Sequence, residues 1–190
     1  MKGAGRVLKK TVLRWEKIAE KWAKQTGLET AAILAVIQQE SGGNANAKRR
    51  ELSYMSRYGS TKKFRDIQIT AKLTAIEVAS SYGLMQLMLP TAWGYMSASD
   101  PVDPVTALLT PDKNIRYGAA HLAALLKKNG GDYSTAFADY NGGGAAAETY
   151  AANVEALRKE YAAALKRRDE LTEKVGAVTA RSLLGNTPLG

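Results

Sequence analysis

An apolar run that ends on a charge restricts the fold of this chain more than any other feature. Residues 29–40, ETAAILAVIQQE, combine good helix formers with a run of Ala, Ile, Leu and Val, which predicts a buried helix. Ile33, Val36 and Ile37 fall on one side of that helix. At about 100° per residue, Glu40 projects within roughly 20° of Ile33, so the acidic side chain shares the apolar face.

The position of Glu40 indicates acid–base chemistry. A carboxyl group on an apolar face loses hydration, which penalises its charged form and raises its pKa, as a general acid near neutral pH requires. Gly42 and Gly43 then end the helix and leave space beside the carboxyl group. A glutamate that turns into water at a helix end is the alternative, and this stretch alone does not choose between the two.

Composition narrows the fold class and the chemistry. The 190 residues suit one domain, and the abundance of Ala, Leu, Lys and Glu predicts a mainly α protein. With no cysteine and one histidine, His121, we expect no disulfide, no metal site and no cofactor. The net charge of +9 favours a polyanionic partner, which is nucleic acid, an anionic membrane or an acidic wall polymer.

The N-terminal part of the chain predicts an amphipathic helix over residues 6–26, stopped by Gly27. Its tryptophans, Trp15 and Trp22, favour docking onto the core over a membrane-surface helix. The basic N-terminus lacks the apolar segment of a secretory signal, and no stretch is long enough to span a bilayer. We therefore expect synthesis in the cytoplasm and another route of delivery.

The C-terminal part predicts a second helical extension, from about residue 147 to 174. We expect residues 176–190 to form a flexible tail.

The segment 45–80 mixes basic residues with Tyr54, Tyr58 and Phe64, and a helix over residues 66–81 could follow. Basic residues with interleaved aromatics can bind single-stranded nucleic acid. Because no nucleic-acid-binding signature accompanies them, we expect a solvated insertion and no specific nucleic-acid partner.

Residues 80–96 carry a second group of candidate site residues. Gly83 allows close backbone approach, Gln86 offers both a donor and an acceptor, and Met85 offers an apolar surface, although core packing is the commoner role of such a methionine. Pro90 resembles the start of a short helix.

A strongly marked helix is predicted from Pro111, with Thr110 as its N-cap and Gly130 at its end. His121 lies off the apolar stripe of this helix, which favours a helix-flank or surface histidine over a catalytic one.

The stretch AFADYNGGG, residues 136–144, leads from a helix into a glycine-rich loop through Tyr140 and Asn141. The lysine and the Ser or Thr of a Walker motif are missing, so a phosphate loop is not expected. A hydroxyl and an amide at a loop edge suit a neutral polymer or the orientation of a carboxylate.

Four motifs in this order resemble those of the lytic transglycosylase SLT family, whose fold is similar to goose-type lysozyme. They are Glu-Ser-Gly at a helix end, Gly-Leu-Met-Gln, the helix NIRYGAAHLAALL, and Tyr-Asn-Gly-Gly. The resemblance covers about residues 15–161 and implies one mainly α, lysozyme-like domain with N- and C-terminal helical extensions, which we place at residues 1–175.

The resemblance also implies roles for individual residues. Glu40 would be the catalytic acid/base, Tyr140 would contact its carboxylate, and a closing helix with Tyr150, Val154 and Leu157 would pack the core. The implied substrate-binding residues are Gly83, Met85, Gln86, Tyr140 and Asn141, with Met85 and Gln86 lining the sugar-binding groove.

The implied reaction is cleavage of the MurNAc-GlcNAc β-1,4 bond of peptidoglycan, with Glu40 as the single acid/base and a 1,6-anhydro product. A second carboxylate, Glu51 or Asp139, would instead give lysozyme-type hydrolysis. A third alternative is a non-catalytic module that binds the cell wall or builds a virion.

The gap between Glu40 and Gly83 is longer than in short bacterial members of the family and resembles phage-borne relatives. We therefore expect action on the cell wall as a phage virion component or endolysin. The expected partners are peptidoglycan glycan strands and virion proteins.

Overall fold

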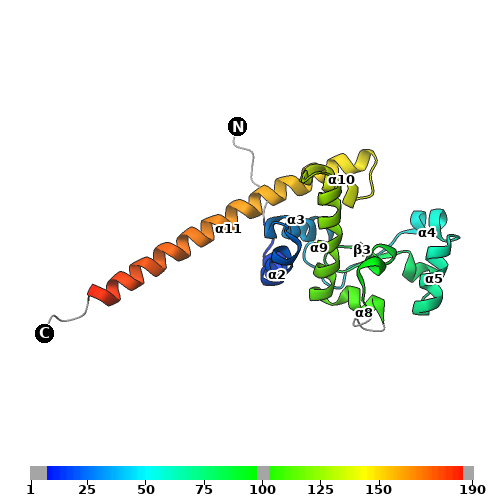
Figure 1. Cartoon of the computed structure of the whole chain (residues 1–190), viewed down its shortest axis with the longest axis horizontal. Helices are drawn as coiled ribbons and strands as arrows, with labels where there is room; N and C mark the ends of the chain where they lie inside the picture. The colour runs from blue at the N-terminus through cyan, green and yellow to red at the C-terminus, as the bar shows by residue number, and fades with distance from the viewer. Residues whose placement is uncertain (1–7, 98–102, 186–190) are drawn as a thin grey trace.

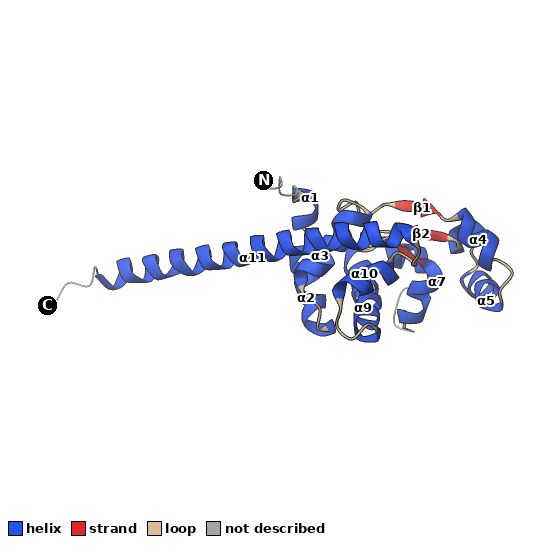
Figure 2. Ribbon diagram, turned by 90° about the horizontal axis from the view of Figure 1, so that it is seen from above, coloured by secondary structure: helices blue, strands red, loops and turns tan. Residues whose placement is uncertain are grey.

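The computed structural model describes residues 8–97 and 103–185, with side chains as far as residue 175. The first residues of the predicted N-terminal helix, 6 and 7, lie outside the described residues. Most of the described chain is helical, which confirms the predicted fold class, and three short strands form a small sheet (Figure 2). The helices are α1 (Lys10–Leu13), α2 (Glu16–Thr26), α3 (Thr30–Glu40), α4 (Leu52–Tyr58), α5 (Lys62–Ala71), α6 (Ala75–Val78), α7 (Leu89–Ala92), the 3-10 turn η1 (Trp93–Tyr95), α8 (Pro104–Leu109), α9 (Pro111–Lys128), α10 (Tyr133–Tyr140) and α11 (Ala145–Gly185).

Helix α3 is the central helix of the domain. Residues 31–37 are all buried, and both α2 and α11 pack against the helix. A helix enclosed in this way is apolar on every side rather than along one stripe. The predicted buried helix is therefore confirmed, and its apolar surface extends further round than the sequence pattern indicated.

The N-terminal segment forms two helices rather than the single one predicted. Helix α1 ends before Trp15, whose indole N–H donates to the Gly43 carbonyl at 3.0 Å. In α2, the indole N–H of Trp22 donates to Asp112 at 3.1 Å, and Gly27 ends the helix with a left-handed φ of 75°. Both tryptophans thus dock onto the domain, in agreement with the favoured interpretation.

The segment 45–80 is folded onto the domain and supplies one strand of the sheet. Strand β1 (Lys48–Arg50) pairs antiparallel with β2 (Ser80–Tyr82), which pairs antiparallel with β3 (Leu87–Met88). Phe64 and Ile67 of α5 are buried in a second hydrophobic cluster. Most other residues of the segment are exposed, as expected for a solvated insertion, but the segment is folded and anchored to the domain by its buried side chains.

The single helix expected over residues 66–81 is also wrong. Helix α5 stops where Lys72 adopts a left-handed conformation, with φ 54°. Thr74 and Glu77 then form a capping box that starts α6, because each side chain accepts from the backbone N–H of the other residue. A capping box supplies partners for free N–H groups and so favours a new helix start over continuation.

The helix predicted from Pro111 is confirmed as α9, which ends at Lys128. Thr110 occupies its N-cap position, but the Thr110 hydroxyl donates to the Thr106 carbonyl at 2.9 Å and caps nothing.

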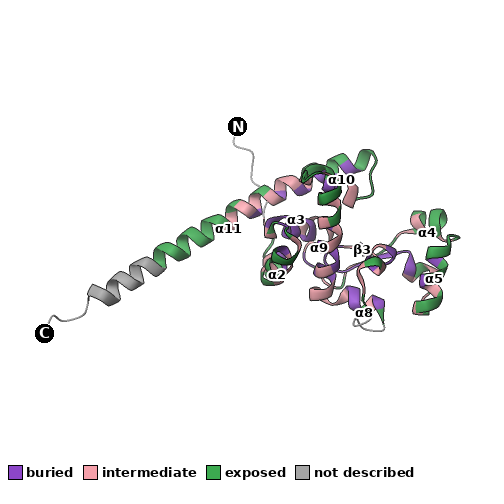
Figure 3. Cartoon of the chain, in the orientation of Figure 1, coloured by how far each residue is buried: buried purple, intermediate pink, exposed green. Residues whose placement is uncertain are grey.

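Helix α11 closes the domain and then leads away from it. Its N-terminal part packs on α3 through buried side chains, which are Tyr150, Val154, Leu157 and Tyr161. Beyond this stripe the helix becomes exposed and projects from the domain (Figures 1 and 3). It reaches Gly185, whereas the sequence predicted an end near residue 174 and a tail from 176. No helix within residues 8–97 and 103–185 is long and apolar enough to cross a membrane.

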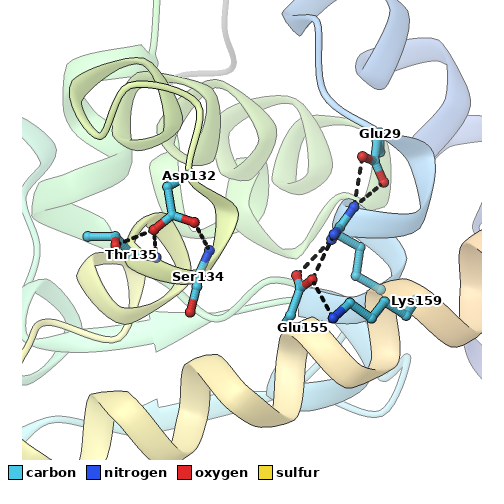
Figure 4. A network of polar contacts seen from close by, with 7 residues as sticks. Glu29, Asp132, Ser134, Thr135, Glu155 and Lys159 are labelled. Carbon is cyan, nitrogen blue, oxygen red and sulfur yellow. Dashed lines mark hydrogen bonds and ion pairs between the residues drawn. The ribbon is translucent and has the colours of Figure 1, made fainter.

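Polar contacts that involve Glu29 and Glu155 fix α11 to the start of α3 (Figure 4). The Arg158 guanidinium contacts the carboxylates of Glu29 and Glu155 at 2.7 Å each, and Lys159 lies 3.4 Å from Glu155. Nearby, Asp132 caps α10 by accepting from backbone N–H groups. Such partly exposed pairs contribute little free energy but fix the orientation of the helices.

Candidate active site

Glu40 is the last residue of α3, and the residues after it are held in place from both sides. The Ser41 hydroxyl donates to the Leu84 carbonyl at 2.7 Å, which ties the helix end to the Gly83–Gln86 segment. Gly43 has a φ of 88°, and a Cβ there would lie 2.3 Å from the Thr11 carbonyl oxygen. Only glycine fits this close approach, which explains the helix stop that follows the acid.

An open cleft of about 410 Å³ lies at the carboxyl-terminal end of α3. The side chains around it come from the end of α3, from α4, from the sheet and from α9 and α10. Its lining includes six of the predicted site residues, which are Glu40, Glu51, Gln86, Asp139, Tyr140 and Asn141. Residues from five separated parts of the sequence therefore meet at one site.

Burial raises the pKa of the Glu40 carboxyl group above its ordinary value. The Tyr150 hydrogen bond and the nearby Arg49 lower that pKa by smaller amounts, and the neighbouring Glu51 raises it. Glu40 consequently keeps its proton to higher pH than an exposed glutamate. The structure thus agrees with the desolvated carboxyl and not with a side chain turned into water.

A tyrosine does contact the Glu40 carboxyl group, but it is not Tyr140. The Tyr150 hydroxyl donates to Glu40 Oε1 at 2.6 Å, whereas the Tyr140 hydroxyl donates to the Met85 carbonyl at 2.9 Å. Burial raises the pKa of both phenols well above the usual range, so both remain neutral donors. The role expected for Tyr140 therefore falls to Tyr150, which was expected only to pack the core.

Met85 and Gly83 support the cleft from behind and do not line it. The Met85 side chain is fully buried and packs so closely on Gly118 that a Cβ there would lie 2.3 Å from the Met85 sulfur. The expectation that Met85 lines the groove is corrected, because its side chain fills the core. At Gly83, with φ 75°, a Cβ would lie 2.3 Å from both Asn114 Nδ2 and the Leu108 carbonyl oxygen.

Asn114 is the residue that holds this segment in place, and the sequence analysis did not single it out. It is fully buried, and its Oδ1 accepts from the Met85 N–H at 2.8 Å. Its Nδ2 donates to the carbonyls of Tyr82 at 2.9 Å and Leu108 at 2.7 Å. One amide thus satisfies three backbone groups around the turn that precedes Gln86.

Gln86 lines the cleft with a backbone φ of 44°, which is sparsely populated for a residue other than glycine. Its Nε2 donates to the carbonyls of Ala47 at 3.1 Å and Gly83 at 2.9 Å, and its Oε1 accepts from Ser81 at 3.1 Å. These three contacts hold the side chain in one orientation, as a substrate-positioning residue requires.

The two candidate second carboxylates both have cationic partners. Glu51 accepts from Arg49 and, at 3.3 Å, from the Ser81 hydroxyl. Asp139 accepts from Asn129 at 3.0 Å and from Lys128 at 2.9 Å, and these contacts lower the pKa of its carboxyl group. Glu51 is close enough to Glu40 to raise the Glu40 pKa, and no such effect is seen from Asp139.

His121 lies at the cleft, which sequence reasoning did not anticipate. Its Nδ1 is 3.2 Å from the Tyr95 hydroxyl, and its ring centroid is 5.3 Å from that of Tyr140. Burial lowers the pKa of the imidazole, which favours its neutral form. The aromatic neighbours of His121, Tyr95 and Tyr140, come from other elements, so its place at the cleft follows from tertiary packing and not from a local sequence signal.

The structure defines a lysozyme-like helical domain with one desolvated carboxyl group in an open cleft. No cluster of His, Asp or Glu able to hold a metal ion occurs within the described part of the chain. The chain belongs to the transglycosylase SLT domain family, whose model matches residues 17–162. This range agrees with the resemblance drawn from the four motifs.

A comparison with solved structures supports the same fold. The domain is similar to an inactive mutant of the lytic transglycosylase Slt from Pseudomonas aeruginosa, with a TM-score of 0.58 and 22% sequence identity. The match covers 79% of this chain but only 24% of that protein. The two proteins therefore share the domain that carries the cleft, and not the rest of the larger chain.

Proposed function

We propose that this protein cleaves the MurNAc-GlcNAc β-1,4 bond of peptidoglycan as a lytic transglycosylase, with Glu40 as its single acid/base. The observation that carries the proposal is the Glu40 carboxyl group, desolvated at the cleft and held by the Tyr150 hydroxyl. Membership of the SLT family supports the same reaction class. A wall-binding or virion structural module would not need a carboxyl group with a raised pKa.

The proposed reaction has two proton transfers through one group. Protonated Glu40 first donates to the glycosidic oxygen as the bond to the anomeric carbon breaks. The resulting Glu40 carboxylate then accepts the proton of the muramyl 6-hydroxyl, whose oxygen bonds to the anomeric carbon and closes the 1,6-anhydro ring. The acid is regenerated and no water is consumed.

The alternative reaction is hydrolysis with a second carboxylate that activates water. Each candidate has one oxygen occupied by a cationic and a neutral donor, which are Lys128 and Asn129 at Asp139 Oδ2 and Arg49 and Ser81 at Glu51 Oε1. Glu51 is the better candidate, because it is close enough to raise the pKa of Glu40, whereas no such effect is seen from Asp139.

Mass spectrometry of the released muropeptides tests the proposal directly. Transglycosylation gives 1,6-anhydro ends, whereas hydrolysis gives reducing ends that contain one added water. Reducing ends as the main product of the wild-type protein, lost in Glu51→Gln, would replace the proposal by lysozyme-type hydrolysis.

Removal of the Tyr150 hydroxyl is expected to change both the rate and its pH dependence. Tyr150→Phe removes a hydrogen bond that favours the charged form of Glu40, so the Glu40 pKa rises further. Because protonated Glu40 is needed for the first step, the fall of kcat on the alkaline side should move to higher pH. We expect kcat at the optimum to drop about tenfold, as for loss of one charge-assisted hydrogen bond.

Tyr161→Phe is the matched control, because Tyr161 also lies on α11 but donates to Gln38. The pH–rate profiles of both variants are compared with that of the wild type. An alkaline limb that stays in place in Tyr150→Phe, or that moves equally in Tyr161→Phe, would contradict this assignment.

We also propose delivery to the cell wall as a phage lytic enzyme. The proposal is supported by the long 45–80 segment and by the net charge of +9, which suits the anionic polymers of the wall. Mass spectrometry of purified phage particles separates a virion component from a freely released endolysin.

A further inference from the structure

Helix α4 forms one wall of the cleft with side chains that the proposed reaction does not use. We call these four residues, Ser53, Tyr54, Arg57 and Tyr58, the α4 face. Their spacing places them on one side of the helix. Figure 1 shows α4 at the end of the domain opposite to the projecting part of α11.

The α4 face is held in place by the sheet and the second hydrophobic cluster. Strand β1, immediately before it, pairs with β2, and the Glu51 N–H donates to the Ala79 carbonyl at 2.8 Å. Tyr54 and Met55 pack against the buried cluster. The wall is therefore attached to the domain at its base, which suits a surface that recognises a ligand.

The two arginines on this side of the cleft, Arg49 and Arg57, differ in whether they have an acidic partner. Arg49 is paired with Glu51, but Arg57 forms no ion pair with any acidic side chain within residues 8–97 and 103–175. An arginine in a cleft without an acidic partner is available to an anionic group of a ligand, and its guanidinium binds carboxylates in a bidentate manner.

An aromatic pair lies beside this arginine. The ring centroids of Tyr54 and Tyr58 are 4.6 Å apart, and both rings belong to the cleft lining. Aromatic faces offer apolar contact, and tyrosine hydroxyls offer hydrogen bonds. The ligand portion that fits the α4 face therefore combines a carboxylate with small apolar and amide groups, which is the chemistry of a peptide and not of a neutral sugar.

We propose that the α4 face binds the peptide substituents of the glycan, with Arg57 as the residue that takes their carboxylate. This inference rests on the proposed function, because it assigns the substrate class for the same cleft. Sugar rings then lie toward Glu40, and the anionic peptide lies toward Arg57, where the nearest carboxylate before the helix, Glu51, is already paired with Arg49. The enzyme should prefer peptide-bearing over peptide-free glycan.

The preference is measured as the ratio of kcat/KM for soluble peptide-bearing strands to kcat/KM for the same strands after amidase removal of the peptides and conversion of the freed lactyl carboxylates to amides. Arg57→Gln should lower this ratio about tenfold, mainly through KM, as expected for loss of a charge-assisted contact. The ratio for Arg57→Lys should lie between those of the wild type and Arg57→Gln, because lysine keeps the charge but not the bidentate geometry. Arg65→Gln on the exposed part of α5 is the matched control and should keep the wild-type ratio.

A ratio unchanged by Arg57→Gln, or lowered equally by Arg65→Gln, would overturn the α4 proposal. A second arm needs no catalysis: the Kd values of Glu40→Gln for the two kinds of strand, with and without Arg57→Gln, should show the same change in preference. If the wild-type protein cleaves neither strand, the proposed function fails, and this binding arm still decides whether α4 recognises the peptide.

Discussion

Glu40→Gln is expected to lower the rate of peptidoglycan cleavage by about a thousandfold, within the range that general acid–base catalysis supplies. The amide has nearly the same shape as the acid but can neither donate the first proton nor accept the second. Release of soluble muropeptides measures the loss. Glu148→Gln, the same change at an exposed position of α11, should leave the rate at the wild-type value.

The Glu40→Gln variant should keep the fold, but the pH dependence of its stability should differ from that of the wild type. The Glu40 pKa is raised in the folded state, so the folded protein binds more protons than the unfolded chain between the ordinary glutamate pKa and the raised one. The stabilising contribution of Glu40 is present at low pH and is lost as the pH rises through its folded-state pKa. Glu40→Gln lacks this loss, so its Tm relative to wild type should rise with pH over this window.

A Glu40→Gln variant that still cleaves at a tenth of the wild-type rate, about 1.4 kcal/mol of lost transition-state stabilisation, would remove Glu40 from the reaction. Loss of rate together with loss of the folded state would point to a structural role instead. Circular dichroism of the two variants separates these outcomes.

Asn114→Ala is expected to produce the largest loss of stability. The change leaves three buried backbone groups without their partner, which are the Met85 N–H and the carbonyls of Tyr82 and Leu108. Each unsatisfied buried group costs about 1–3 kcal/mol, and we expect the free energy of unfolding to fall by about 3–5 kcal/mol in total. A typical domain has only about 5–15 kcal/mol to lose.

Urea unfolding measures this effect. Asn46→Ala, the same change at an exposed loop position, should alter the free energy of unfolding by no more than about 0.5 kcal/mol. Because Asn114 fixes the turn before Gln86, the remaining folded fraction of Asn114→Ala should also cleave more slowly. Equal stabilities of the two variants would show that the Asn114 contacts are not needed for the fold.

The sequence was sufficient to place the Glu40 carboxyl group on an apolar helix face, because the relevant information is local. The period of α3 sets the direction of Glu40, and the glycines after it set the end of the helix. The same holds for α9, whose start at Pro111 follows from local helix-start preferences. Family motifs then placed Gln86, Tyr140 and Asn141 near the acid, and the structure finds all three in the lining of its cleft.

The hydrogen-bond partner of the Glu40 carboxyl group could not be found from local sequence patterns. Tyr140 and Tyr150 both lie in the last two helices of the domain, α10 and α11. Only the packing of α11 on α3 decides which of the two hydroxyls reaches Glu40. Likewise, the sequence allows Met85 to be either a groove residue or a core residue, and its contact with Gly118 decides between them. Both questions depend on distances between separate elements of the fold, and the local periodicity of the sequence does not determine these distances.

The 45–80 segment shows a different limit of sequence reasoning. Its mixture of basic and aromatic residues indicated a solvated insertion. Strand β1 gives no local signal, because it is only three residues long and all of them are exposed. Pairing with β2, more than thirty residues away, is what brings Glu51 and α4 to the cleft. Strand pairs of this kind are fixed by long-range contacts rather than by local propensity.

The protonation of Glu40 is measured most directly by titrating its carboxyl group in the wild-type protein. The titration is followed by NMR of the glutamate side-chain carboxyl carbons, and the Glu40 signal is the one that Glu40→Gln removes. We expect a midpoint above the ordinary glutamate value of about 4.3, and a further rise in Tyr150→Phe. A midpoint at or below that ordinary value would show that burial does not help this carboxyl group keep a proton for transfer to the substrate.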